Sequence, residues 1–434
     1  MDVNQLIKNA GHKSLLPLQK KALEVSSAKD HIILLSKTGS GKTLAFLLSI
    51  INLLQDDTRG VQALIVAPTR ELCLQIEEEF KSLKSGFHSV VCYGGHPVRI
   101  EVNNLKANPS VVIGTPGRLC DHITRENLDL NATHFFVVDE YDKCLEFGFK
   151  EELDFIHHKL GDLSTRMFVS ATELDETPYR NDDDSSETIN FIKEDDTIDL
   201  TTYFVDYQKD LKGALIGLMN QFQLERTILF CNYREVVDDI VGFFEDHEIT
   251  SIGYHGGLEQ EDRERAIIKF KNKSANILVC TDLGSRGLDI SDVEHVVHYQ
   301  YPSSKEAFIH RNGRTARMES TGNVYLFIGD NTQLPEYIEK PNKQFSIKNT
   351  ENLYPLPEFE TIYFSAGKKD KINKIDFVGF LSKVGKLKPN EIGLINVLDH
   401  TSYVAIARDK VRQTLGRIKG EKVKGKKLKI ELSK

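Results

Sequence analysis

The sequence lacks the features of a membrane-spanning or secreted chain. No apolar run among its 434 residues approaches the ~20 residues that a membrane-spanning helix needs. Residues 1–5 contain neither the basic segment nor the apolar core of a signal peptide. Its 6 cysteines contain no C-x-x-C pair, so their spacing predicts reduced, buried thiols rather than a zinc site. We therefore expect a cytoplasmic protein with no membrane attachment.

The chain also lacks the overall positive charge that many nucleic-acid-binding proteins carry. Its net charge is -8, but that charge is unevenly distributed. Residues 366–434 hold 18 Lys and Arg against 7 Asp and Glu, a net charge of +11, which leaves -19 for residues 1–365. An acidic body with a basic C-terminal region predicts that this end of the chain attaches to a polyanion.

The most informative stretch is a glycine-rich loop between a predicted strand and a predicted helix. An apolar run at residues 31–35 precedes the loop, and apolar residues at helical spacing follow it over residues 44–54. Strand, glycine turn and helix are typical of a phosphate-binding loop, in which backbone N–H groups and the helix N-terminus face phosphate oxygens. The alternative is an ordinary glycine turn at the start of a helix. The predicted loop is Ser36, Lys37, Thr38, Gly39, Ser40, Gly41, Lys42 and Thr43, with Ser36 where the strict pattern has glycine.

Two side chains of this loop have specific predicted roles. Lys42 would bridge the β- and γ-phosphates, and the Thr43 hydroxyl would ligate Mg²⁺. Upstream of the loop, Gln19 follows a proline and leads into a predicted helix. Its amide could read the adenine edge with both a donor and an acceptor, although a surface glutamine is the alternative.

Two acids end another predicted strand. Asp139 and Glu140 follow the apolar run at residues 135–138, as a Walker-B acid pair does. Asp139 would hold Mg²⁺ through water, and Glu140 would orient and deprotonate the attacking water. Because strands ending in two acids are common, this prediction depends on the phosphate loop.

The order of predicted elements indicates two α/β domains in tandem. The chain is too long for one core and suggests about two to four domains. In each domain, strands alternate with helices, which predicts a parallel sheet covered on both faces, with ligand sites at the carboxyl ends of the strands. We assign residues 1–173 to the first domain, 174–200 to an acidic linker and 201–340 to the second domain. The predicted strands are 31–36, 61–67, 89–93, 110–114, 134–139 and 166–170, then 202–206, 227–231, 250–254, 276–280, 294–299 and 322–328.

The second domain has no phosphate loop, but arginines gather near its end. Arg314 and Arg317 are three residues apart, which places them on one face of a helix start. Arginines that reach across a cleft stabilise charge on a transferred phosphoryl group, with an effect of about 10³–10⁵ on the rate. A solvated basic turn is the alternative, which the preceding strand and Gly313 disfavour.

The motifs between about Leu15 and Gly329, and the order in which they follow one another, resemble those of the DEAD-box RNA helicases. The resemblance implies two RecA-like domains with ATP and Mg²⁺ in a cleft between them, and single-stranded RNA held through its backbone. ATP and RNA together would close the domains and bend the RNA, and hydrolysis would reopen them. The implied RNA contacts are Pro68, Thr69, Arg70, Gly94, Gly95, Thr115, Pro116, Gly117 and Arg118, then Gly257, Gln260, Arg263 and Thr281.

The same resemblance implies roles for further residues, and it shows where this sequence differs from the family motifs. It implies ATP contacts at Gly287 and Asp289. Tyr141 replaces the alanine of the Asp-Glu-Ala-Asp tetrad and is bulky enough to alter the coupling of hydrolysis to RNA. No aromatic residue that would stack on adenine precedes Gln19. Asn312 and Ala316 replace the usual Ile or Val and Gly of the last motif, and the implied coupling residues are Asp142, Ser170, Thr172, His310 and Arg311.

Residues 358–434 predict a small basic α+β domain. Predicted strands at 361–365, 392–396, 403–407 and 427–432, with helices at 374–384 and 410–418, give the βαββαβ order of an RRM-like fold. The strand at 403–407 lacks the spaced aromatic pair that stacks on bases, so we expect basic segments to bind RNA. A solvated charged face is the alternative. The predicted contacts are Lys368, Lys369, Lys424, Lys426 and Lys427.

Residues 367–372 and 400–404 resemble the DbpA-type RNA-binding domain. That resemblance implies targeting to structured ribosomal RNA, and hence a role in assembly of the large ribosomal subunit. Tethering would raise the local concentration of the helicase core near its duplex. We expect an RNA-dependent ATPase and helicase that acts as a monomer. An ATP-controlled RNA clamp or annealing chaperone, and a DNA-directed translocase, are the alternatives.

Overall fold

The structure of the chain is a computed structural model. It describes all residues except 1, 38, 57, 96, 162, 175–177, 181–184, 193–199, 208–209, 283–289, 291–292, 316–321, 331, 339–342, 348–352 and 434. The chain forms two compact units that meet in sequence near residue 198. Within the described ranges, no helix combines the length and the apolar character that crossing a bilayer requires.

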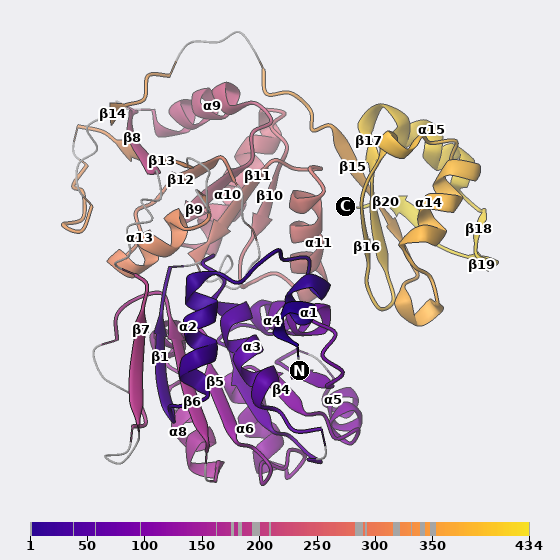
Figure 1. Ribbon diagram of the computed structural model, residues 1–434. Helices are drawn as coiled ribbons and strands as arrows, with labels where there is room; N and C mark the ends of the chain where they lie inside the picture. The colour runs from indigo at the N-terminus through magenta and orange to yellow at the C-terminus, as the bar shows by residue number, and fades with distance from the viewer. Residues whose placement is uncertain are drawn as a thin grey trace. The chain divides into compact units, whose positions relative to one another are not determined.

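The first unit contains a parallel sheet with the strand order β3-β4-β2-β5-β6-β1-β7 (Figure 1). Strands β1, β2, β4, β5 and β6 are buried along their whole length, and most of their residues are apolar, because helices cover both faces of the sheet. This arrangement confirms the predicted parallel sheet. The strands are β1 (His31–Leu35), β2 (Ala63–Val66), β3 (Ser89–Cys92), β4 (Val111–Gly114), β5 (Phe135–Val138), β6 (Thr165–Ser170) and β7 (Ser186–Asn190).

The helices of this unit form two layers, one on each face of the sheet, and each layer packs against its own hydrophobic cluster. Alternate strand residues point to opposite faces, so Ile65 belongs to one cluster and its neighbour Leu64 to the other. One layer consists of α1 (Val3–Asn9), α2 (Pro17–Ser26), α3 (Lys42–Leu53) and α4 (Arg70–Ser82). The other layer consists of α5 (Val98–Leu105), α6 (Pro116–Thr124), α7 (Tyr141–Glu146) and α8 (Lys150–Lys159).

Strand β7 lies within the segment predicted to be an acidic linker. It pairs in parallel with β1 and buries Ile189, while Thr188 and Asn190 stay exposed. The linker prediction was therefore wrong for residues 186–190. A strand at a sheet edge forms its ladder through backbone groups and needs few apolar side chains, which is why the sequence pattern did not reveal it. The acidic runs 182–184 and 194–196 lie outside the described residues.

The second unit begins with another parallel sheet, of order β10-β11-β9-β12-β13-β8-β14. Helices α9 (Leu211–Phe222) and α10 (Arg234–Asp246) pack on one face of it. Two further helices are α11 (Gln260–Lys271) and α13 (Lys305–Asn312). The strands are β8 (Leu200–Asp206), β9 (Thr227–Cys231), β10 (Ser251–Tyr254), β11 (Ile277–Thr281), β12 (His295–His298), β13 (Gly322–Ile328) and β14 (Lys343–Gln344), of which β14 lies beyond the predicted domain end at 340.

The C-terminal domain has an antiparallel sheet of order β16-β17-β15-β20 and confirms the predicted βαββαβ order. Helices α14 (Lys374–Lys383) and α15 (Arg408–Ile418) share a core with the sheet. A small hairpin, which was not predicted, turns at Lys424 and Gly425 with positive φ angles. The strands are β15 (Phe359–Phe364), β16 (Ile392–Val397), β17 (Ser402–Ala407), β18 (Lys422–Val423), β19 (Lys426–Lys427) and β20 (Ile430–Leu432), and two 3-10 helices are η1 (Lys368–Asp370) and η2 (Pro389–Glu391).

Candidate nucleotide and RNA sites

The predicted phosphate loop connects β1 to α3. Gly39 and Gly41 have φ angles of +83° and +84°, a region that residues with a β-carbon rarely adopt. The Lys42 ammonium donates to the carbonyl oxygen of Ser36 and, at 3.0 Å, to that of Lys37. The Ser40 hydroxyl is buried and has no hydrogen-bond partner among the described residues. A buried hydroxyl and an ammonium group at the start of a helix suit phosphate oxygens. Thr38 lies outside the described residues.

Gln19 packs directly against this loop. Its Nε2 atom donates to the carbonyl oxygen of Gly41 at 3.3 Å, and its Oε1 atom accepts the Leu16 N–H at 2.9 Å. A β-carbon at Gly41 would lie 2.5 Å from Gln19 Nε2, and the φ angle of +84° also disfavours any residue with a side chain there. Gln19 is buried, so the alternative of a surface glutamine was wrong. Its contact with adenine stays a prediction.

Asp139 and Glu140 follow β5 in the first sheet. The buried Asp139 accepts the backbone N–H of Glu140 through Oδ1 at 2.9 Å. Burial, reinforced by the Glu140 carboxylate, raises the pKa of Asp139 to about 7, and the Lys42 ammonium acts in the opposite direction. Mg²⁺ prefers hard oxygen ligands, and the Asp139 carboxylate and the Thr43 hydroxyl would supply them. When bound, the cation would favour the ionised carboxylate and neutralise phosphate charge.

The predicted coupling residues of the first domain lie together at the ends of β5 and β6. Thr172 Oγ1 donates to Asp142 Oδ2 at 3.3 Å, and the Thr172 N–H donates to Ser170 Oγ at 3.1 Å. Tyr141 is buried, and its ring packs edge-on against Phe168 with centroids 5.3 Å apart. The bulk of this unusual residue is therefore accommodated in the hydrophobic core beneath α7.

Three predicted RNA-contacting loops follow β2, β3 and β4, which are neighbours in the sheet. Tyr93, which the sequence did not single out, connects these loops. The Arg70 guanidinium lies 4.7 Å from the Tyr93 ring centroid, and Arg118 Nε donates to the Tyr93 carbonyl oxygen at 3.0 Å. Arg70 Nη1 also donates to Gly94 O at 3.4 Å. The structure thus brings together the predicted segments that contain Pro68, Thr69, Gly95, Thr115, Pro116 and Gly117.

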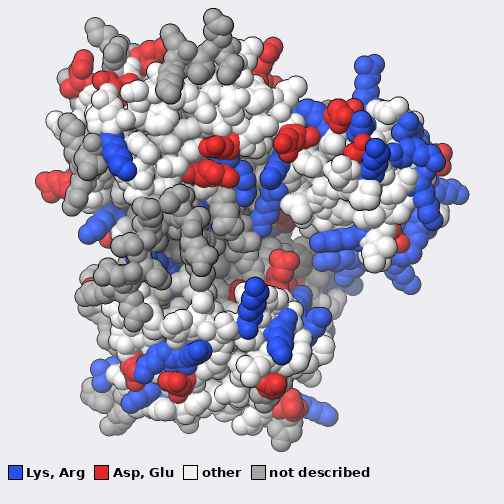
Figure 2. Space-filling model, turned by 45° about the horizontal axis from the view of Figure 1, so that its top comes forward, with Lys and Arg blue, Asp and Glu red and all other residues white. Residues whose placement is uncertain are grey.

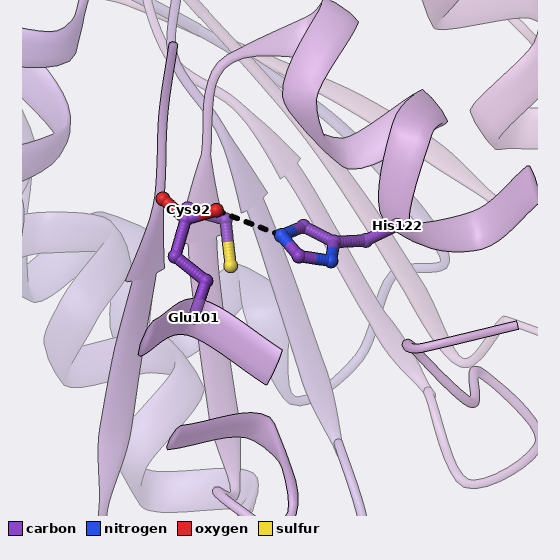
Figure 3. A group of neighbouring side chains, drawn as sticks. All are labelled: Cys92, Glu101 and His122. Atoms are coloured by element: carbon purple, nitrogen blue, oxygen red, sulfur yellow. Dashed lines mark hydrogen bonds and ion pairs between the residues drawn. The ribbon is translucent and has the colours of Figure 1, made fainter. Parts of the chain in front are cut away.

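A buried cluster of Cys92, Glu101 and His122 lies beside these loops (Figure 3). Their ligand atoms are within 4.8 Å of one another, the spacing of a possible metal site. The donor set does not fit a metal, because Glu101 already accepts from His122 at 2.8 Å and forms an ion pair with Arg118 at 3.1 Å. Burial also raises the pKa of the Cys92 thiol to about 12, which disfavours the thiolate that binds metals. No motif spacing in the sequence could have revealed this cluster.

The RNA contacts predicted in the second domain also lie at strand ends. Gly257 lies in the loop after β10, Gln260 and Arg263 lie in the first turn of α11 that follows this loop, and Thr281 ends the neighbouring strand β11. Arg263 Nε donates to the Leu258 carbonyl oxygen at 3.1 Å, which orients that side chain at the start of α11. The predicted ATP contacts Gly287 and Asp289 lie outside the described residues.

Arg311 is the buried centre of the last motif. It donates to both carboxylate oxygens of Asp282, at 2.6 and 2.7 Å, to Asn232 Oδ1 at 2.8 Å and to Gln300 O at 2.7 Å. Its guanidinium therefore organises the second domain from within. His310 and Arg314 are also buried in this unit, and Arg317 lies outside the described residues.

Comparisons with known proteins agree with this architecture. Residues 16–178 match the DEAD/DEAH box helicase family, 210–319 the helicase conserved C-terminal domain and 361–432 the DbpA RNA binding domain. The chain is 30% identical to the ATP-dependent RNA helicase DbpA of Bacillus subtilis, over 99% of this chain and 97% of that protein. It is 28% identical to DbpA of Escherichia coli, over 98% and 95%. The solved structure of Mss116p bound to single-stranded RNA and AMP-PNP is similar with a TM-score of 0.68 and 28% identity, over 76% of this chain and 73% of that one.

Proposed function

Because this chain belongs to the DEAD-box ATP-dependent RNA helicases and ends in a DbpA-type RNA-binding domain, we propose that it remodels structured ribosomal RNA during assembly of the large ribosomal subunit. The observation that carries this proposal is the net positive charge of the folded C-terminal domain, which contrasts with the net negative charge of the rest of the chain. A separate basic domain can anchor the helicase core beside one RNA and so raise its local concentration there. We further propose that the protein acts as a monomer in the cytoplasm.

The two basic segments predicted to bind RNA form one surface on the C-terminal domain. Lys426, in the small hairpin, forms an ion pair at 2.9 Å with Asp370, which shares the η1 turn with Lys368 and Lys369. Lys424, at the tip of the hairpin, forms an ion pair at 3.1 Å with Asp376 of α14. Figure 2 shows Lys and Arg side chains crowded over this domain. We define the basic surface as Lys368, Lys369, Lys422, Lys424, Lys426 and Lys427, all exposed.

The outer face of the C-terminal sheet is less available to RNA. Thr361, on β15, is buried, and its Oγ1 atom lies 2.7 Å from Ser274 Oγ. Asn396 Nδ2 donates to Asn272 Oδ1 at 3.2 Å. Residues that follow α11 therefore cover part of the face on which RRM-like sheets stack bases. This contact supports RNA binding through the basic surface rather than through the sheet.

We propose a division of roles between the helicase domains. Lys42 holds the β- and γ-phosphates, Thr43 and Asp139 hold Mg²⁺, and Glu140 activates the attacking water. Arg314 and Arg317 of the second domain stabilise the charge that develops on the γ-phosphate. The loops after β2, β3 and β4 hold the RNA backbone without reading its sequence.

Phosphate release and strand displacement test this function. A hairpin fragment of large-subunit ribosomal RNA should stimulate ATP hydrolysis at a lower concentration than an unstructured RNA of equal length, and a short duplex beside the hairpin should separate. Stimulation without displacement would instead support an RNA clamp. Equal stimulation by DNA of the same sequence would support a DNA-directed translocase and contradict the proposal.

A further inference from the structure

We propose that Glu101, held by His122, is a positioning residue that sets the geometry of the RNA-contacting loops in the first domain. The inference rests on the proposed RNA contacts of Gly94, Gly95 and Arg118. Glu101 lies on α5 and belongs to none of the motifs that the sequence revealed.

Glu101 on α5 connects the end of β3 to α6, and Figure 3 shows its hydrogen bond to His122 of α6. Its Oε1 atom accepts the backbone N–H of Tyr93 at 3.1 Å, immediately before the Gly94-Gly95 loop. Its Oε2 atom accepts from His122 Nε2 at 2.8 Å and lies 3.1 Å from Arg118 Nε. His122 and Arg118 are both on α6, one helical turn apart, so the carboxylate connects the loop after β3 to the helix after β4.

Because Glu101 is buried, its carboxylate depends on these protein donors. The side chain has no solvent-exposed area, so water cannot replace a donor that moves away. A buried carboxylate is stable only while N–H groups and a cation compensate it, and here these come from Tyr93, Arg118 and His122. Displacing either loop would therefore leave the charge uncompensated, so the loops are held in one arrangement.

Arg118 and Tyr93 transmit this geometry to the surface. Arg118 uses one edge of its guanidinium, at Nε, for both Glu101 and the Tyr93 carbonyl oxygen. This fixes the direction in which the rest of the planar group points. Tyr93 in turn lies under the Arg70 guanidinium, so the same carboxylate also supports the loop after β2.

The exchange Glu101→Gln tests the role of the carboxylate. A carboxamide has one acceptor oxygen for three converging donors, and its NH₂ group would face another N–H. We expect the RNA concentration that gives half-maximal ATPase stimulation, measured with a short oligouridylate, to rise about tenfold. The turnover at saturating RNA should fall less than twofold. Glu151→Gln, on the exposed surface of α8, is the matched control and should behave as the wild type.

His122 provides a rescue test. His122→Gln retains an N–H that can donate to Glu101, whereas His122→Leu removes it. The Leu variant should weaken the apparent affinity for the oligouridylate more than the Gln variant does. Binding of a fluorescein-labelled oligouridylate, measured by anisotropy in the presence of AMP-PNP, reports this directly.

The outcomes separate this inference from the proposed function. If Arg118→Lys weakens RNA binding but Glu101→Gln changes only the melting temperature, Glu101 is merely structural and the inference fails alone. If Arg118→Lys also leaves RNA affinity unchanged, the proposed contacts of this loop fail, and the inference fails with them. A tenfold loss for Glu101→Gln with partial retention in His122→Gln supports both.

Discussion

His298 and Asn312 form a buried pair in the second helicase domain, with the Nε2 atom of His298 2.9 Å from Oδ1 of Asn312. Because a carboxamide oxygen only accepts, His298 carries its proton on Nε2. Its Nδ1 atom is then an acceptor and lies 3.5 Å from Nη1 of Arg311. The ring joins β12 to α13 beside the guanidinium that binds Asp282. Asn312, which departs from the usual family motif, thus has a specific partner in this chain.

This pair predicts acid sensitivity of the second domain. Burial, and then the neighbouring Arg311, lower the pKa of His298 from 6.5 to about 3. Below pH 6.5 the unfolded chain takes up a proton that the folded domain excludes, so stability falls by about 1.4 kcal/mol per pH unit, or about 2 kcal/mol at pH 5. Urea unfolding between pH 7.5 and 5 should show this loss in the wild type, with a smaller slope in His298→Gln.

Exposed His247 provides the control for that experiment. His247→Gln should keep the wild-type dependence of unfolding free energy on pH. If His298→Gln and the wild type lose stability equally between pH 6.5 and 5, His298 is not the group responsible.

The phosphate loop predicts the result of replacing Lys42. Lys42→Ala removes the ammonium that would contact the β- and γ-phosphates, and hydrolysis should fall by a factor of about 10² or more, the usual effect of losing such a stabilising group. Phosphate release in saturating RNA measures this. Lys150→Ala, at an exposed position on α8, is the control. Near-normal turnover of Lys42→Ala would contradict the assignment of the loop.

We expect replacement of Glu140 to trap the protein with ATP and RNA bound. Glu140→Gln preserves size and polarity but removes the base, so turnover should fall by about 10²–10⁴ while ATP and RNA remain bound. The measurement is the rate at which labelled RNA dissociates after ATP is added, which should be much slower than in the wild type. A variant that hydrolyses ATP freely would exclude Glu140 as the base.

The basic surface predicts a change in salt dependence. Replacing Lys368 and Lys369 together by Ala removes two phosphate contacts, so the slope of log K against log salt should become shallower by about 1.4–1.8 for a ribosomal RNA hairpin. Titrations at several salt concentrations measure this slope. The double variant Lys150→Ala and Lys159→Ala changes the same charge on the exposed surface of the first domain. An equal effect in both double variants would indicate nonspecific attraction.

Local motifs accounted for most of the fold and are the basis of the predicted nucleotide contacts. The phosphate loop needs glycines, Lys42 and Thr43 within one short stretch between a strand and a helix, so its pattern is legible without a structure. The alternating strands likewise predicted the parallel sheets. The sequence did not show that Tyr141 packs against Phe168, because a bulky residue beside an acid pair reads the same whether it faces the site or the core.

By itself, the sequence determined the order of the domains and the separation of the acidic body from the basic C-terminal domain, and it predicted a phosphate loop. These are properties of neighbouring residues and of composition. The tertiary structure alone decided that β7 completes the edge of the first sheet, that Glu101 meets His122 and Arg118, and that Lys426 meets Asp370. Such contacts join residues far apart in the chain, and only the folded backbone brings their side chains within hydrogen-bonding distance.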